Sequence, residues 1–89
     1  MKAVITVLGK DQTGIIARVS MLLYREEVNI LDISQTIMGG VFTMIMLVEF
    51  SRAGEKFALV REKLNALGDE IGLEIRIQHS QIFDAMHKV

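Results

Sequence analysis

The chain has 89 residues, which is enough for one small domain and too few for two. Apolar residues make up 51% and charged residues 24%, a composition typical of a globular chain rather than a disordered one. The 10 basic and 11 acidic residues are scattered and give a net charge of −1, which argues against a surface for nucleic acid or for an anionic membrane.

The sequence contains no cysteine, which excludes disulfides and thiolate metal sites. Its first residues, MKAVITVLG, have no small-residue cleavage site and are typical of a strand rather than a signal peptide. The longest mostly apolar run, Val41 to Val48, is far shorter than the roughly 18 residues that cross a bilayer. We therefore expect a cytoplasmic protein. Because so small a domain buries little core, we also expect it to associate with a second copy.

The first half of the chain predicts a strand followed by a helix. Lys2–Leu8 is rich in β-branched residues, which favour a strand. From Gly14 to Glu26 the apolar residues recur at helical spacing, which indicates an amphipathic helix. The residues of this apolar stripe are Ile15, Val19 and Leu22, with Ile16 and Leu23 beside them.

The second half predicts a hairpin, a second helix and a last strand. Asn29–Met38 and Val41–Phe50 are strand-like runs joined by Gly39-Gly40, a strong signal for a two-residue turn. Glu55–Ile71 carries apolar residues at helical spacing and is closed by Gly72. Leu73–His79 alternates apolar and polar residues, as a half-buried strand does.

The order β-α-β-β-α-β predicts one α+β domain over residues 1–89. The economical arrangement is a ferredoxin-like sandwich, with a four-stranded antiparallel sheet and both helices on one face. The glycine turn sets the pairing of the hairpin: Met38 with Val41, Ile37 with Phe42 and Ile33 with Met46. We expect the helices to cover Leu31, Ile33, Ile37, Phe42, Met44, Met46 and Val48. The other face then collects Asp32, Ser34, Thr36 and Thr43, but also Val41, Ile45 and Leu47.

The end of the chain, residues 80–89, is predicted to be an amphipathic extension. Ile82, Met86 and Val89 stand at i, i+4 and i+7 with Phe83 adjacent, which favours a short C-terminal helix after Ser80. We expect it to cover the apolar centre of the second sheet face, on its own sheet or on a partner's.

The chemistry of the common catalytic and metal sites is missing. Gly9 to Gly14 spells G-x-x-x-x-G, but isoleucines follow where a phosphate-binding P-loop needs Lys and Ser or Thr. His79 and His87, the only histidines, have neither metal-ligand spacing nor an orienting carboxylate. The first strand lacks the aromatic residues on which RNA-binding ferredoxin-like folds stack bases. We therefore predict no catalytic residue, no metal, no cofactor and no nucleic-acid partner.

The loop from Gly9 to Gly14 is the remaining candidate. Free N–H groups at the start of the following helix favour a carboxylate there. Two interpretations are open: Asp11 or Thr13 caps this helix, or the loop binds a ligand. Asn29, which opens the next strand, is on its own an ordinary turn residue.

The stretches GKDQTGI (Gly9 to Ile15) and VNILDISQT (Val28 to Thr36) resemble the ACT domain, a ferredoxin-like regulatory module of amino-acid-controlled proteins. The likeness covers nearly the whole chain through His79. It is closest to small stand-alone ACT proteins and extends to one half of the glycine-cleavage regulator. Many relatives have Asp-Arg-Pro-Gly where this chain has Asp-Gln-Thr-Gly.

The resemblance implies a homodimer that binds an amino acid where the loop meets the start of the second strand. The implied ligand-binding residues are Gly9, Lys10, Asp11, Gln12, Thr13, Gly14, Ile15, Asn29 and Ile30. With no catalytic domain attached, the chain would act on a separate protein partner or serve as a sensor. The alternatives are an interaction module without ligand and a small ferredoxin-like hydrolase, against which the absence of Arg and His from the loop counts.

Overall fold

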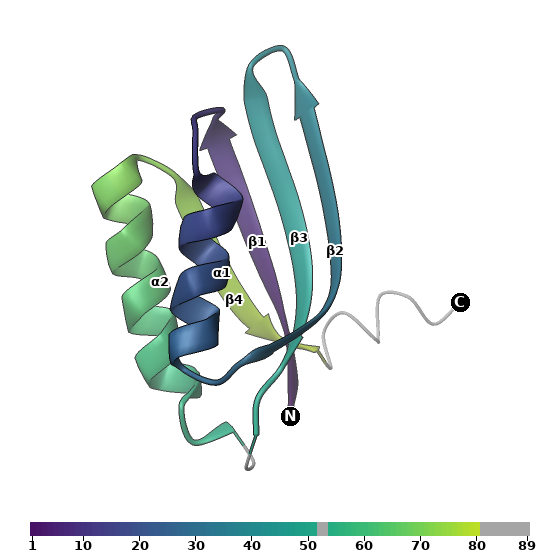
Figure 1. Ribbon diagram of the computed structural model, residues 1–89, viewed down its shortest axis with the longest axis vertical. Helices are drawn as coiled ribbons and strands as arrows, with labels where there is room; N and C mark the ends of the chain where they lie inside the picture. The colour runs from purple at the N-terminus through teal and green to yellow at the C-terminus, as the bar shows by residue number, and fades with distance from the viewer. Residues whose placement is uncertain (52–53, 81–89) are drawn as a thin grey trace.

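The elements follow one another along the chain in the predicted order (Figure 1). The computed structural model describes residues 1–51 and 54–80. The bounds of the elements differ from the predicted ones by at most two residues at either end. They are β1 (Lys2–Lys10), α1 (Ile15–Arg25), β2 (Asn29–Met38), β3 (Val41–Glu49), α2 (Phe57–Ile71) and β4 (Glu74–His79).

The strands form one antiparallel sheet in the order β2-β3-β1-β4, and α1 and α2 lie side by side on one of its faces (Figure 1). This is the ferredoxin-like α+β arrangement predicted from the sequence. β2 and β4 are the edges of the sheet. The predicted C-terminal helix falls on residues that lie outside the described ones. No helix among residues 1–51 and 54–80 is long and apolar enough to cross a membrane.

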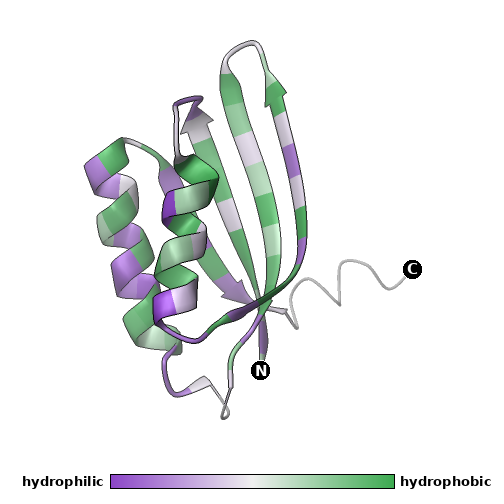
Figure 2. Cartoon of the chain, viewed as in Figure 1, coloured by the Kyte–Doolittle hydropathy of each residue, from purple (hydrophilic) through white to green (hydrophobic). Residues whose placement is uncertain are grey.

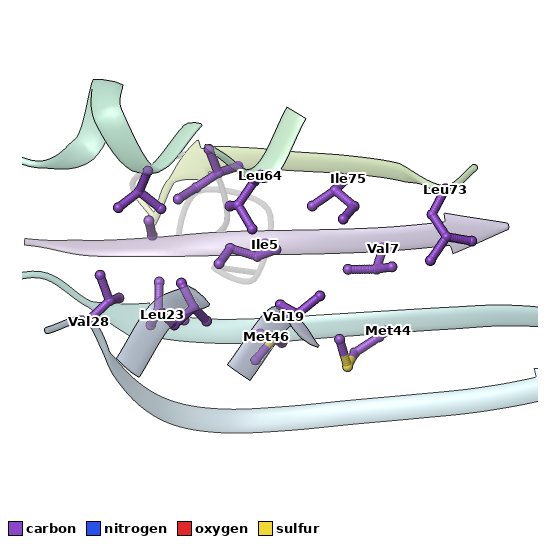
Figure 3. Close-up of a cluster of buried hydrophobic side chains, with 14 of the residues drawn as sticks. Ile5, Val7, Val19, Leu23, Val28, Met44, Met46, Leu64, Leu73 and Ile75 are labelled. Atoms are coloured by element: carbon purple, nitrogen blue, oxygen red, sulfur yellow. The ribbon is translucent and has the colours of Figure 1, made fainter. Parts of the chain in front are cut away.

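The core lies between the sheet and the helices (Figure 3). Ile5 and Val7 of β1 and Met44 and Met46 of β3 are fully buried. Two adaptable thioether side chains in the middle of the sheet agree with the expectation that these methionines fill the core. Val19 and Leu23 of α1 and Leu64 of α2 complete it from above.

The hairpin has the predicted register, but its outer strand is not covered. Met38 pairs with Val41, Ile37 with Phe42 and Ile33 with Met46. On β3 the residues expected under the helices are buried, whereas on β2 Leu31, Ile33 and Ile37 are 40–51% exposed. The prediction of a covered β2 was therefore wrong. The helices leave the outer strand β2 uncovered along much of its length (Figure 1). The register also shifts at Leu31, which has no partner on β3.

The face opposite the helices is apolar along its centre, as predicted. Figure 2 shows polar and apolar bands that alternate along β2, whereas β3 is apolar along most of its length. Val41 is 46% and Ile45 41% exposed on this open face. On β2 the same face carries polar residues, so its apolar part runs along β1 and β3.

Candidate functional site

The candidate loop connects β1 to α1 at one end of the sheet. There Gly9 pairs with Phe42 and Lys10 with Val41, so the loop begins beside the hairpin turn. The backbone N–H of Asp11 donates a 2.8 Å hydrogen bond to the carbonyl oxygen of Gly40. The turn therefore holds the first residue of the loop in place.

Helix α1 begins without a side-chain cap. Gly14 is its N-cap residue, in the left-handed conformation with φ 86° and ψ 10°, and no side chain donates or accepts a hydrogen bond at the cap. The first bond inside the helix runs from the N–H of Arg18 to the carbonyl of Gly14. The capping interpretation for Asp11 and Thr13 is therefore wrong. The free N–H groups of the first turn face the loop. Because this turn also holds no acidic residue, none of its side chains compensates the positive end of the helix dipole.

The two glycines of the loop motif have separate physical reasons. A Cβ on Gly9 would lie 2.4 Å from Cδ2 of Leu73, a buried residue that joins α2 to β4. Gly9 thus leaves room for the Leu73 side chain, which would have to shift to admit a Cβ. A Cβ on Gly14 would meet nothing within 4 Å, but its φ of +86° is costly for any residue with a side chain. Gly14 is a conformational requirement, and the space beside it is open.

Gln12 connects the loop to the second helix. Its side-chain Nε2 donates a 2.8 Å hydrogen bond to the carbonyl oxygen of Ile71, the last residue of α2. Carbonyls at a helix C-terminus have no partner within the helix, so this bond satisfies one of them. The loop is therefore anchored on two sides, at the hairpin turn through Asp11 and at α2 through Gln12.

Asn29 and Ile30 lie at the other end of the sheet. Asn29 pairs with Glu49, which in turn pairs with Lys2 at the start of β1 (Figure 1). Gly9 lies seven positions after Lys2 along β1, or roughly 23 Å away at about 3.3 Å per residue. One chain thus brings Gly9, Lys10, Asp11, Gln12, Thr13, Gly14 and Ile15 together but does not bring Asn29 and Ile30 to them.

An apolar strip runs along the uncovered edge of the molecule. Ile33 and Ile37 of β2 point to the helix side of the sheet, 41% and 51% exposed. Arg18 and Leu22 lie on the side of α1 that faces α2. Ile16 stands two positions before Arg18 and therefore lies on the opposite side of the helix, where it is 40% exposed. The backbone groups of β2 that point away from β3 also have no strand partner in the described chain. An edge of this kind favours pairing with another strand.

A charged cluster joins the far ends of the two helices. Glu26 accepts a 2.5 Å hydrogen bond from Nζ of Lys63, and Nζ of Lys56 lies 3.8 Å from its other carboxylate oxygen. The hydrogen bond from Lys63, aided by the charges of both lysines, lowers the pKa of Glu26 below its ordinary value of 4.5. Because Glu26 ends α1 and Lys56 precedes α2, the cluster fixes the helix pair at the end remote from the loop. The spacing of these residues in the sequence did not predict this cluster.

A cleft of about 570 Å³ lies between α1 and α2. Leu22 and Leu67 line it, and the ion pair of Arg18 with Glu70 crosses it. None of the residues predicted for ligand binding lines this cleft. Among the described residues, no group of three or more His, Cys, Asp or Glu side chains could hold a metal ion.

The comparisons with known proteins agree on one domain type. The family model described as the ACT domain matches residues 2–78. The UPF0237 protein CA_C0478 of Clostridium acetobutylicum is 51% identical over the whole of both chains. The UPF0237 protein MJ1558 of Methanocaldococcus jannaschii is 46% identical over 99% of this chain and 98% of that protein.

Two solved structures extend this likeness to the fold. An ACT domain protein from Streptococcus pneumoniae superimposes with a TM-score of 0.83 and 41% identity, over 98% of each chain. A putative glycine cleavage system transcriptional repressor gives a TM-score of 0.78 and 30% identity over 86% of this chain, but over only 44% of its own longer chain.

Proposed function

The chain belongs to the ACT-domain family, and from this premise we propose that it is a non-catalytic sensor that binds a free amino acid between two copies of itself. ACT domains are generally regulatory modules that bind small ligands. One observation carries the finer proposal: within one chain, the two halves of the implied binding site lie at opposite ends of the sheet. A complete site therefore needs a second chain.

The loop supplies the half of the site that recognises the amino-acid backbone. An α-carboxylate would accept hydrogen bonds from the N–H groups of Gly14 and Ile15, which no side chain caps. The exposed carboxylate of Asp11 stands before the same helix end and would receive the ammonium group in a charge-assisted hydrogen bond. The open space beside Gly14 leaves room for the ligand.

Antiparallel pairing of two β2 strands would supply the other half. If the strands pair over their full length, Asn29 of one copy lies opposite Met38 of the other. Met38 borders the hairpin turn, whose Gly40 carbonyl is bonded to Asp11. A two-fold axis through β2 therefore moves Asn29 from the far end of its own sheet to the loop end of its partner's. The same pairing would bury the exposed Ile33 and Ile37.

A thermal-shift screen against the common amino acids tests the binding. A ligand at a hundred times its dissociation constant should stabilise the protein by about 2.7 kcal/mol. The anchoring of Gln12 on α2 favours a second candidate function, an interaction module whose loop is only structural. If no amino acid raises the melting temperature, this second function is the better account.

A mixing experiment tests whether the site is shared. Asp11→Ala damages the loop half and Asn29→Ala the strand half, so each variant alone should bind the amino acid weakly. In a mixture that exchanges subunits, every heterodimer has one site with both changes and one intact site. Calorimetric titration of an equimolar mixture should then find tight binding at about a quarter of all sites, the fraction expected for random pairing. A mixture that binds no better than the variants do singly would show that the two residues do not share a site across chains.

A further inference from the structure

The open face of the sheet carries a stripe of apolar residues that the described elements leave uncovered. The stripe consists of Leu8 on β1 and of Val41, Ile45 and Leu47 on β3, and the buried Val4 lies beside Leu47. Leu8 and Val41 are each 46% exposed and Ile45 is 41% exposed, while α1 and α2 lie on the opposite face (Figure 1). Exposed apolar residues grouped on one face mark a surface that packs against something else.

The stripe is hollowed rather than flat. A depression of about 420 Å³ lies over β1, β3 and β4, with Leu8 and Ile45 among its lining residues. Thr6 and Thr43 lie in it, and the ion pair of Glu74 with Arg76 borders it on β4. The hollow thus presents apolar side chains beside hydroxyl groups and is bordered by charges on β4, a form suited to an amphipathic segment that is itself apolar on one side.

The chain leaves the sheet at the margin of this stripe. His79, the last residue of β4, pairs with Ala3, so it lies next to Val4. Residues 81–89 follow one residue later. Ile45 lies two strand spacings across from β4 and, because it pairs with Thr6, three residues along the strands from the level of His79, or about 14 Å away in all. Residues 80–89 reach about 15 Å at the roughly 1.5 Å rise per residue of a helix and about 33 Å when extended, so the segment is long enough.

We propose that the segment 81–89 packs on the open face of its own chain and fills this stripe. The apolar residues that would enter it are Ile82, Phe83, Met86 and Val89. A second copy could in principle cover the same face, but a segment tethered one residue away has an effective concentration of about millimolar. The tether therefore favours the chain's own segment. This docking would also reserve the β2 edge as the surface for self-association.

A spin label tests the docking directly. Because the chain has no cysteine, Lys88→Cys can carry a nitroxide at one defined place. If the segment lies on the stripe, the label should broaden the methyl resonances of Leu8 and Ile45 and leave those of Leu64, buried on the helix side, sharp. The broadening should persist when labelled, isotopically enriched chains are diluted with unlabelled, unenriched ones. Unbroadened Leu8 and Ile45 methyls would overturn the proposal.

Two further measurements remove the remaining ambiguities. Met86→Asp in the labelled chain should abolish the broadening and lower the melting temperature. His87→Asp, a matched charge outside the apolar spacing, should do neither. Equal effects of the two variants would refute the packing of Met86. Broadening in a mixture where label and isotope are on different chains would show that the segment docks on a second copy, which also overturns docking on its own chain.

Discussion

Replacing Ile37 by alanine should weaken the proposed dimer without weakening the fold. Ile37 is 51% exposed in one chain, on the helix side of the edge strand β2. Complete burial of an isoleucine side chain contributes about 1.5–3 kcal/mol, so the exposed half contributes about 1 kcal/mol when a second copy covers it. A two-fold axis repeats each contact, so the loss per dimer is about 2 kcal/mol. The dimer dissociation constant should therefore rise roughly 30-fold.

Sedimentation over a range of protein concentrations measures this constant. Ile45→Ala is the matched control, because Ile45 has a similar exposure of 41% but lies on the open face. It should leave the dissociation constant unchanged. Should Ile45→Ala weaken the dimer while Ile37→Ala does not, the contact would lie on the open face, and the shared site built on β2 would be refuted.

The remaining predictions concern the loop and the helix ends. Asp11→Asn should leave the unfolding free energy unchanged, since Asp11 does not cap α1. It should lower the affinity for the amino acid tenfold or more, as measured by calorimetry. Equal affinities of the variant and the wild type would remove Asp11 from the site. Gly14→Ala should lower the free energy of unfolding, measured by chemical denaturation, by about 1–2 kcal/mol, because Gly14 has a φ of +86°. Gly14→Asn should lower it less. An unchanged free energy in Gly14→Ala would contradict the left-handed cap. The lowered pKa of Glu26 means that its ion pairs stabilise the fold above the unfolded-state pKa and are lost as pH falls through the folded-state value. Stability measured from neutral pH to below pH 4.5 should thus decline less for Glu26→Gln than for the wild type, and identical slopes would show that the cluster contributes nothing.

The fold could be predicted because its signals are local. The Gly39-Gly40 turn alone fixes which residues of β2 and β3 face each other, and the observed register agrees. The alternation of residues along the strands could not predict how much of the sheet the helices cover. Ile33 and Met46 are a directly opposed pair of the same character, yet Met46 is buried and Ile33 is 41% exposed. Their difference depends on where α1 lies above the sheet, which the alternation of residues within a strand does not contain.

The candidate site was predictable only in part, because its connections are long-range. The loop motif identified Gly9 and Gly14, but the packing of Gly9 against Leu73 and the bond of Gln12 to Ile71 join residues about sixty positions apart. No spacing rule reaches that far. The separation of Asn29 from the loop follows instead from topology: β1 and β2 both pair antiparallel with β3 and so run parallel to each other, which puts their starts at the same end of the sheet.

A site shared by two chains makes a thermodynamic demand that a site within one chain does not. If the ligand contacts Gly14 of one copy and Asn29 of the other, it binds the dimer more tightly than it binds the monomer. By linkage, each bound ligand must then lower the dimer dissociation constant by the factor by which dimerisation raises its affinity, and a dimer with two such sites gains that factor twice at saturation. Sedimentation with and without the amino acid should show this tightening, and Asn29→Ala should reduce it. An amino acid that binds the loop yet leaves the dimer constant unmoved would place the whole site within one chain. Where the tightening is found, self-association is itself the signal that such a sensor can pass to a partner protein.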